Sequence, residues 1–500
     1  MSVKRGVDPK YSVVKKLFGI FGLLFCGSIL VQAQIWSTQF DVSGTGYNNV
    51  RPRIALMTDN TPIVLWGDDV NNAVYTAIWN GSGFDTPVRV HSLNSNAFTS
   101  YWAGPEIAAS GDTVFIGLKI IPEDQHGVYS VRSVDAGQTY DDTVRIDISP
   151  DSLTRFPTVA IAAGGNPVFA YMKFDMNWLD PQYHVANSSD GGLTFNGDVA
   201  ATALAPDEVC DCCPANIQVQ GQRQVLAFRN NWADLRETWA SVSEDGGNTF
   251  TSVGNIDTSE WIIFACPSTG PDAVLMGDEL TTVYMSAGSG KAKVYVSEAD
   301  LASNFNVDFQ SMLQTADPVT AQANYVRLAG GDDVLAAVWQ HTEFGDSDVY
   351  FTTSNSGAAG MVDNIDTANI DTDGLQQSPD IAYADGTFHI VWKDNDSGVV
   401  MYRSVTVPYN PSVGIEQVCR DPLSAVLSPN PFNNLSTLMF NNTDNELFCM
   451  RIYDMTGRLN KEIWTSEDSA TISADMLKPG TYLYVLTGPK SEDRGKLMVH

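Results

Sequence analysis

Short apolar runs, each followed by a turn rich in glycine or aspartate and then by a second apolar run, recur along most of this chain. Each copy begins with a phrase close to Pro-x-Ile-Ala and ends on an aromatic or large apolar residue, as in RPRIALMTDNTPIVLW and SPDIAYADGTFHIVW. The anchor positions are Pro52, Pro105, Pro157, Pro214, Pro271, Val326 and Pro379, so the period is 52 to 57 residues. Such a period indicates a repeated structural unit.

The runs have the length and spacing of β-strands, and helical periodicity is almost absent. We therefore predict an all-β chain with one four-stranded β-propeller blade per unit, giving seven blades, or six with one degenerate unit. An extra strand, IWSTQFDVS at 35–43, precedes the first unit, and the last unit lacks its fourth strand. We expect the two to pair and close the ring, which would remove exposed sheet edges.

Composition narrows the class of protein. The chain has 500 residues with 59 acidic and 29 basic side chains, a formal charge of −30 that argues against nucleic acid and anionic membranes as partners. Residues 1–33 combine lysines, a short apolar stretch and Gln32-Ala33, as in a cleaved export signal. No later segment is apolar enough over sufficient length to span a bilayer. We expect an exported monomer.

Cysteine usage fits export. Cys26 lies in the signal, and six cysteines remain: Cys210, Cys212, Cys213, Cys266, Cys419 and Cys449. An even number in an exported chain favours disulfides, and the alternative for the first four is a thiolate metal site. Cys419 and Cys449 are candidates to cross-link a C-terminal domain.

Three successive units carry the same turn: SVDAGQTY at 133–140, SSDGGLTF at 188–195 and SEDGGNTF at 243–250. The aspartate can accept backbone N–H bonds and the glycine allows positive φ, so we expect a structural turn. On this motif, residues 35–408 resemble the sialidase-like Asp-box (BNR) propellers, and we assign 34–408 to the propeller. The segments CDCCP, FRNNWADLRETW and WIIFACPSTGP resemble an exported, uncharacterised subgroup of these proteins.

After a linker at 409–420, the sequence changes to LSPNPFNNLSTLMF, MRIYDMTGRL, LKPGTYLYVLTG and GKLMVH. This order resembles the C-terminal sorting domain (type A) of the type IX secretion system of Bacteroidetes. We read 421–500 as a small β-sandwich. The resemblance implies a secretion-machinery partner, passage across the outer membrane, and release or attachment at the cell surface.

Two variable positions of the repeat carry charge. The residue after the second strand is basic in four units: Lys119, Lys173, Arg229 and Lys393. They either ring an anion-binding mouth or extend over apolar strand ends. The variable residues inside the first strand are Arg53, Glu106, Thr158, Ala215, Asp272, Arg327 and Asp380. They either form a site for an anionic sugar or pair with one another across the channel.

The sialidase resemblance implies three arginines on a substrate carboxylate, for which Arg53, Arg229 and Arg327 are candidates. It also implies a tyrosine nucleophile with a glutamate, where Tyr325 and Glu237 are candidates. The candidate catalytic acids are Asp272, Glu106 and Asp380.

A further set of residues lies between the cysteine segments: Arg229, Trp232, Arg236 and Trp239. Arginine and aromatic side chains on braced loops suit acidic carbohydrate. Asp363, Asp366, Asp371 and Asp373 could bind calcium or form a solvated turn, and we expect no other cofactor. The leading hypothesis is an exported propeller that binds acidic glycan around units four and five, and the alternatives are an exo-sialidase-type hydrolase and a protein-interaction scaffold.

Overall fold

The computed structural model of the chain describes the residue ranges 34–45, 48–148, 151–316, 320–331, 333–407, 421–423, 425–442, 445–446, 448–454, 459–474, 477–488 and 491–500. The predicted export signal at 1–33 and the predicted linker at 409–420 lie outside these residues. The chain divides into two compact units, Met1–Tyr409 and Asn410–His500, each taken here by itself.

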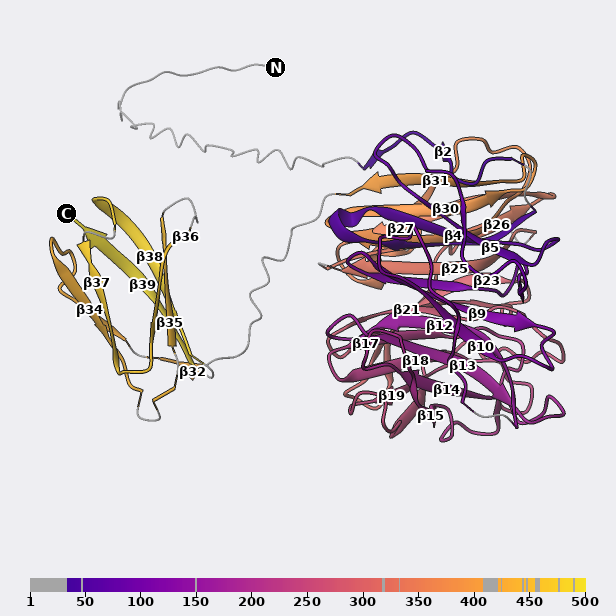
Figure 1. The fold of residues 1–500 in the computed structure, drawn as a ribbon, viewed down its shortest axis with the longest axis horizontal. Coiled ribbons are helices and arrows are strands. Elements are labelled where there is room, and N and C mark those ends of the chain that lie inside the picture. Colours follow the sequence, from indigo (N-terminus) through magenta and orange to yellow (C-terminus); the bar gives the residue numbers. More distant parts are fainter. Residues whose placement is uncertain are drawn as a thin grey trace, which may run out of the picture. The chain divides into compact units, whose positions relative to one another are not determined.

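The described part of the first unit contains seven antiparallel sheets (Figure 1). The first holds β3 (Asn49–Leu56), β4 (Pro62–Asp68), β5 (Ala73–Ile78) and β6 (Val88–Arg89). The second holds β7 (Asn96–Ala97), β8 (Glu106–Ser110), β9 (Thr113–Ile121), β10 (Val128–Ser133) and β11 (Val144–Arg145). The third holds β12 (Leu153–Ile161), β13 (Pro167–Phe174), β14 (Gln182–Asn187) and β15 (Asn196–Ala200).

The fourth sheet holds β16 (Glu208–Val209), β17 (Asn216–Gln220), β18 (Arg223–Asn231), β19 (Thr238–Ser243) and β20 (Ser252–Asn255). The fifth holds β21 (Asp272–Met276), β22 (Glu279–Ser286), β23 (Lys293–Asp300) and β24 (Asn306–Met312). The sixth holds β25 (Gln322–Gly331), β26 (Val334–Glu343), β27 (Asp346–Ser354) and β28 (Ile365–Thr367). The seventh holds β29 (Gln376–Ala384), β30 (Thr387–Asp394), β31 (Val399–Thr406), β1 (Ile35–Trp36) and β2 (Phe40–Asp41). Two 3₁₀ turns are also present, η1 (Thr58–Asn60) and η2 (Ala358–Met361).

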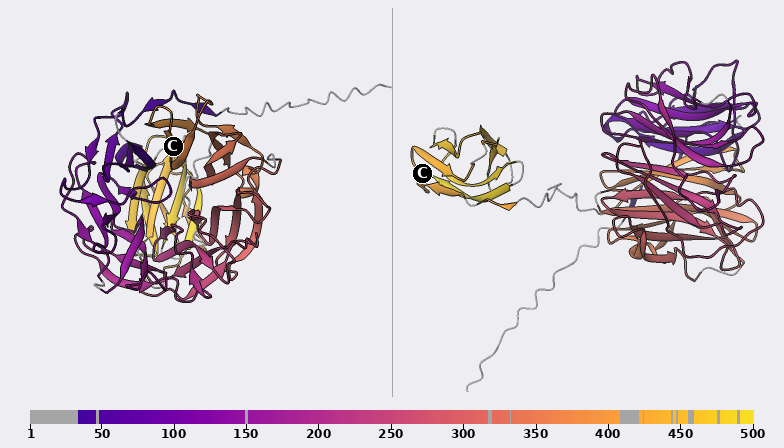
Figure 2. Two further views of the ribbon diagram at one scale, coloured as in Figure 1. Left: turned by 90° about the vertical axis from the view of Figure 1, so that its right-hand side faces the viewer. Right: turned by 90° about the horizontal axis from the view of Figure 1, so that it is seen from below.

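The sheets are arranged in a ring around a central axis (Figure 2, left). The inner strands β3, β8, β12, β17, β21, β25 and β29 contact one another in succession, and β29 also contacts β3. The ring joins where β1 and β2 pair with β31, with Ile35 opposite Thr406 and Phe40 opposite Tyr402. The all-β prediction is confirmed, and the extra N-terminal strand lies where the sequence predicts it.

Apolar alternation explains why the sheets stack face to face. The aromatic that closes the repeated phrase is fully buried between sheets at Trp66, Trp339 and Trp392. Burial of one such side chain contributes roughly 1.5–3 kcal/mol. The repeated apolar runs therefore form the core between neighbouring sheets.

A bulge precedes the proline of the repeated phrase in several units. The pairing register shifts at this point in β3, β12, β25 and β29. The bulged residues have positive φ: 49° at Arg51, 53° at Phe156, 52° at Tyr325 and 51° at Ser378. Proline donates no ladder hydrogen bond, so it tolerates the bulge in β3, β12 and β29. The bulged side chains of Arg51, Tyr325 and Ser378 line one pocket at the axis, whereas Phe156 is buried in the core.

The three repeated aspartate turns share one set of hydrogen bonds. In the second of them, Asp190 accepts from the Thr194 backbone N–H at 2.9 Å and from the Thr194 hydroxyl at 2.6 Å. The Gly192 N–H donates to Ser188 Oγ at 2.8 Å. These bonds lower the pKa of Asp190 to about 2, because they favour its charged form. The turns are structural and lie on the face that carries the connections between first and second strands.

The second unit contains two sheets. One holds β32 (Asp421–Pro422), β39 (Ser491–Val499), β38 (Gly480–Thr487), β35 (Phe448–Asp454) and β36 (Leu459–Thr465). The other holds β33 (Val426–Ser428), β34 (Leu435–Met439) and β37 (Ser469–Ser473). Side chains from both sheets form one core. Cys449 is a free, buried cysteine of this unit, and its predicted partner Cys419 lies outside the described residues.

Candidate functional site: an arginine-lined pocket at the axis

A small pocket lies at the end of the axis where the connections into the inner strands converge. Its charged lining residues are all arginines: Arg51 and Arg53 of β3 and Arg327 of β25. The remaining lining residues are Tyr101, Trp102, Pro214, Ala215, Thr269, Gly270, Pro271, Tyr325, Val326, Ser378 and Pro379. Both alternatives predicted for the variable first-strand residues are therefore present in part. Some of these residues line a pocket, and others pair with the arginines of that pocket.

Three carboxylates lie behind the arginines and are absent from the pocket lining. Glu106 pairs with Arg51, with Arg53 Nε at 3.2 Å and with Arg327 Nη2 at 3.5 Å. Arg327 Nε also lies 2.8 Å from Asp380 Oδ1.

Arg327 Nε lies 3.4 Å from the third carboxylate, Asp272 Oδ2. Two of these acids also hold neighbouring strands together. The Leu328 N–H donates to Asp272 Oδ2 at 2.8 Å, and the Ile54 N–H donates to Asp380 Oδ2 at 2.9 Å. The candidate catalytic acids thus support the arginines and the ring.

Burial and the ion pairs of this network shift the pKa values of its arginines and carboxylates. Burial alone would raise the pKa of Glu106, but Arg51, Arg53 and Arg327 lower it to about 2. Burial lowers the pKa of Arg51 to about 9, with Arg53 acting in the same direction. Burial opposes the charge of Arg327, yet Asp272 and the other carboxylates raise its pKa. Burial raises the pKa of Asp272, although Arg327 acts in the opposite direction.

Aromatic side chains form the rim. Tyr101 is 60% exposed, and its ring meets that of Tyr325 edge to face at 6.5 Å. Ser378 Oγ donates to the Tyr101 carbonyl at 3.2 Å, which fixes this loop to β29. The interior volume is about 30 Å³. One water needs roughly 10–15 Å³, so the pocket admits a carboxylate-sized group while a sugar ring would rest on the rim.

Arg229 does not face a ligand, contrary to the prediction. Its side chain is fully buried. The guanidinium donates to the carbonyls of Thr269 at 3.2 Å, Arg236 at 2.6 Å and Met285 at 2.7 Å, and it lies over the Trp261 ring. Buried carbonyls without strand partners need donors, and Arg229 supplies them.

The predicted basic ring around the mouth is also corrected. Lys119 is buried and donates to the carbonyls of Glu123 and His126. Lys173 forms an ion pair with Asp198. Lys393 is half-buried, and burial lowers its pKa. Lys119 and Lys173 therefore bond within their own blades, and the charged neighbour of Lys393 is Asp69 of the first sheet's β4–β5 turn.

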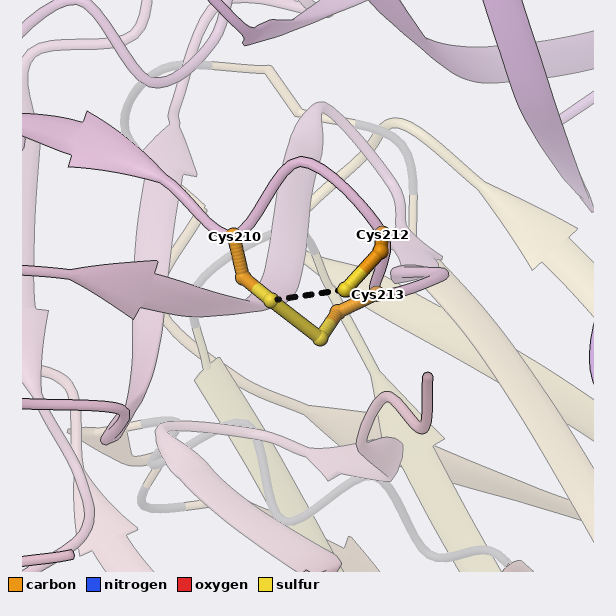
Figure 3. A group of neighbouring side chains, drawn as sticks. All are labelled: Cys210, Cys212 and Cys213. Atoms are coloured by element: carbon orange, nitrogen blue, oxygen red, sulfur yellow. Dashed lines mark hydrogen bonds between the residues drawn. A yellow bond between two sulfur atoms is a disulfide. The ribbon is translucent and has the colours of Figure 1, made fainter. Parts of the chain in front are cut away.

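Four cysteines form two disulfides beside the fourth and fifth sheets. Cys210 is bonded to Cys213, and Cys212 is bonded to Cys266. Three of the four lie in one turn, with Cys210 Sγ 3.7 Å from Cys212 Sγ (Figure 3). The Cys212–Cys266 bond joins the connection into β17 to the connection into β21. The structure thus has two loop-bracing disulfides, the leading interpretation of these cysteines.

The connection between β18 and β19 pairs with the braced connection into β21. The Arg236 N–H donates to the Trp261 carbonyl at 2.8 Å, and the Ile263 N–H donates to the Asp234 carbonyl at 3.0 Å. Trp232, in the connection between β18 and β19, is 52% exposed, whereas Trp239 packs against the core of the third and fourth sheets. Arg236 is 8% exposed, and its Nε and Nη1 have no hydrogen-bond partner among the described residues.

Glu237 is a buried carboxyl of the same region and is not among the residues that line the axial pocket with Tyr325. Its Oε2 accepts from Asn255 Nδ2 at 2.6 Å. Burial, reinforced by Asp257, raises the pKa of Glu237 from 4.5 to about 7. The predicted tyrosine and glutamate pair therefore does not form one site.

Glu237 predicts a pH dependence of stability. The folded state favours the protonated form of Glu237. The contribution of this carboxyl to the free energy of unfolding is therefore complete below pH 4.5 and is lost as the pH rises through about 7. We expect Glu237→Gln to exceed the wild type in Tm increasingly from pH 4.5 to 8. Melting curves across this range test it, with Glu244→Gln, an exposed carboxylate of the same sheet, as control. A constant Tm difference across this range would contradict the assignment.

The carboxylates of the acidic stretch before the last unit do not gather at one point. Asp363 accepts from the Thr315 N–H at 2.7 Å, and Asp366 accepts from Trp36 Nε1 at 3.2 Å. The Asp373 N–H donates to Asp371 Oδ1 at 3.2 Å. Among the described residues, the only cluster with potential metal-ligand geometry is Cys210, Cys212 and Cys213. The two alternatives for this stretch, a solvated turn and a calcium site, both stay predictions.

Sequence reasoning named Tyr325 but missed Arg51, Tyr101 and Trp102. Arg51 occupies the bulge immediately before Pro52, the position taken by Tyr325 in the sixth unit. Tyr101 and Trp102 lie in an irregular connection. The residue preceding the repeated phrase was a third variable position, and comparing it across units would have found Arg51.

Comparison with known proteins identifies one of the two units. Residues 427–500 match the model of the secretion system C-terminal sorting domain. The protein is therefore secreted or held at the cell surface, and its tail engages secretion machinery. No curated protein matches the sequence. Across the described residues, none of the helices could cross a bilayer.

Several solved structures have a similar fold. A protein of unknown function from Dyadobacter fermentans is 11% identical with a TM-score of 0.47, covering 76% of this chain and 100% of its own. A PL25 ulvan lyase is 10% identical with a TM-score of 0.47, covering 73% and 95%. The Trypanosoma rangeli sialidase is 10% identical with a TM-score of 0.42, covering 93% and 89%.

Proposed function

We propose that this exported propeller binds an acidic glycan through the axial pocket. The observation that carries the proposal is the lining itself: its charged groups are Arg51, Arg53 and Arg327, within a chain of formal charge −30. Arginine guanidinium groups favour carboxylate and sulfate by paired, charge-assisted hydrogen bonds. The carboxylates behind them fix their orientation and limit repulsion among them.

The rim supplies the second half of the site. A glycan carboxylate enters the small interior, and its sugar ring rests on Tyr101, Tyr325 and Trp102. Apolar sugar faces stack on aromatic rings, and the two tyrosines also offer hydroxyl groups. The pocket volume of about 30 Å³ favours a terminal or side-branch acid over an embedded chain.

The geometry favours binding over hydrolysis. Burial and Tyr101 raise the pKa of Tyr325 to about 12, which opposes its use as a nucleophile at neutral pH. Glu106, Asp272 and Asp380 stand behind the arginines rather than in the pocket lining. We therefore expect no release of sialic acid from a fluorogenic sialoside, and turnover lost on Arg53→Gln would replace this proposal with a hydrolase.

Truncation of the rim tests binding. We expect Tyr101→Ala to weaken binding of acidic oligosaccharides on a glycan array by about tenfold, since a stacked aromatic contributes on the order of 1 kcal/mol or more. Phe344→Ala removes an 88% exposed aromatic away from the pocket and is the matched control. Equal losses in both variants, or no acidic glycan bound by the wild type, would contradict the proposal.

A further inference from the structure

A second and larger pocket lies on the opposite face of the ring, at the junction of the first and seventh sheets. Its volume is about 680 Å³, within the range of pockets for small ligands. Its walls come from β2, η1, the turn after β5, β30 and β31. The lining residues are Ser37, Thr38, Phe40, Asp59, Asn60, Thr61, Pro62, Trp79, Asn80, Gly81, His389, Tyr402 and Ser404.

One wall is aromatic. The Trp79 ring meets Phe40 edge to face at 4.8 Å and lies 5.7 Å from Tyr402. Phe84 supports the group, 5.4 Å from Trp79 and 5.1 Å from Tyr402. These contacts hold Trp79 as a fixed, half-buried surface within the pocket lining.

The other wall holds a buried histidine with one unused nitrogen. His389 is 8% exposed, and its Nδ1 lies 2.8 Å from the Tyr402 hydroxyl. Its Nε2 has no hydrogen-bond partner among the described residues, although the side chain lines the pocket. Burial lowers the pKa of His389 to about 4, so the imidazole is neutral at pH 7. A neutral ring nitrogen is well matched to a ligand hydroxyl.

The turn that carries Trp79 differs from the three aspartate turns. Trp79 occupies the position of the serine of those turns, since its N–H donates to the Pro62 carbonyl as the Ser188 N–H donates to the Pro167 carbonyl. Asn80 Oδ1 holds the turn by accepting from the N–H groups of Ser82 and Gly83 at 3.1 and 3.2 Å. In the aspartate turns the serine at this position bonds within the turn, as Ser188 Oγ does by accepting from the Gly192 N–H at 2.8 Å. Here the turn is anchored without using Trp79, whose ring remains at the pocket.

The chemistry of the lining selects the ligand class. It contains hydroxyl and amide groups, one carboxylate at Asp59, and no lysine or arginine. An anionic ligand would gain no cation here and would face the negative potential of the chain. We propose that this junction pocket binds a neutral saccharide, whose ring stacks on Trp79 and whose hydroxyl bonds to His389 Nε2. The site is separate from the axial pocket and does not rest on the function proposed for it.

Calorimetry on the full chain tests this with neutral trisaccharides, namely maltotriose, cellotriose, mannotriose and xylotriose. We expect at least one to bind, and Thr38→Trp, which places an indole at an exposed rim position, to weaken it by about tenfold or more. Trp79→Ala should weaken it similarly, and Tyr101→Ala should not. Absence of binding by all four probes, or unchanged affinity in Thr38→Trp, overturns the proposal. Loss of acidic glycan binding alone would affect only the axial pocket.

Discussion

Replacing Arg327 by alanine should lower the free energy of unfolding by about 3–5 kcal/mol, because it leaves buried charges without their partner. Arg327 contacts Glu106, Asp272 and Asp380 from three other inner strands. Their carboxylates would then lose the cation that offsets their burial. Urea denaturation followed by tryptophan fluorescence measures the change.

The matched control is Arg223→Ala. Arg223 also joins two carboxylates, Glu244 and Asp278, but these are 57% and 60% exposed. Exposed ion pairs contribute about 0–1 kcal/mol. A loss of stability for Arg327→Ala no greater than that for Arg223→Ala would contradict the view that the axial network holds the ring together.

Cys266→Ala should lower the free energy of unfolding by about 2–4 kcal/mol, because the Cys212–Cys266 disulfide restricts the unfolded chain. The bond closes a separation of 54 residues and joins two connections that carry Thr269, Gly270 and Pro214 of the axial pocket. The variant should therefore also bind acidic glycan more weakly.

Reduction supplies the control for this prediction. A reducing agent should lower the stability of the wild type to near that of Cys266→Ala. The agent should affect the variant little further, because Cys210–Cys213 closes a separation of only 3 residues. Equal stability of wild type and variant under oxidising conditions would show that the loops are held by other contacts.

The repeat made the fold predictable, because period-two apolar runs with fixed turns leave few alternatives. It also placed Arg53, Glu106 and Arg327 together correctly, since residues at one position of an inner strand must converge at the axis. Arg229 and Lys119 could not be interpreted in this way. Whether a cation faces solvent or backbone depends on which carbonyls lack partners, and that is set by loop paths that a repeat does not specify.

The aromatic rim shows the same limit. Tyr101 lies in an irregular connection, where no periodicity predicts direction. Arg51 lies immediately before Pro52, outside the repeated phrase, so only a comparison of that preceding position across units could have pointed to it. Pairing of Cys212 with Cys266 likewise required the folded loops, since cysteine spacing alone permits several connectivities.

We expect Arg51, Arg53 and Arg327 to recognise a sugar acid by its charge. Calorimetry with glucuronic acid and N-acetylneuraminic acid, each compared with its own methyl ester, tests this most directly. Esterification keeps the ring and removes the negative charge. We expect at least one free acid to bind and its ester to bind at least about tenfold more weakly. Equal affinity for acid and ester, or no affinity for either acid, would contradict it.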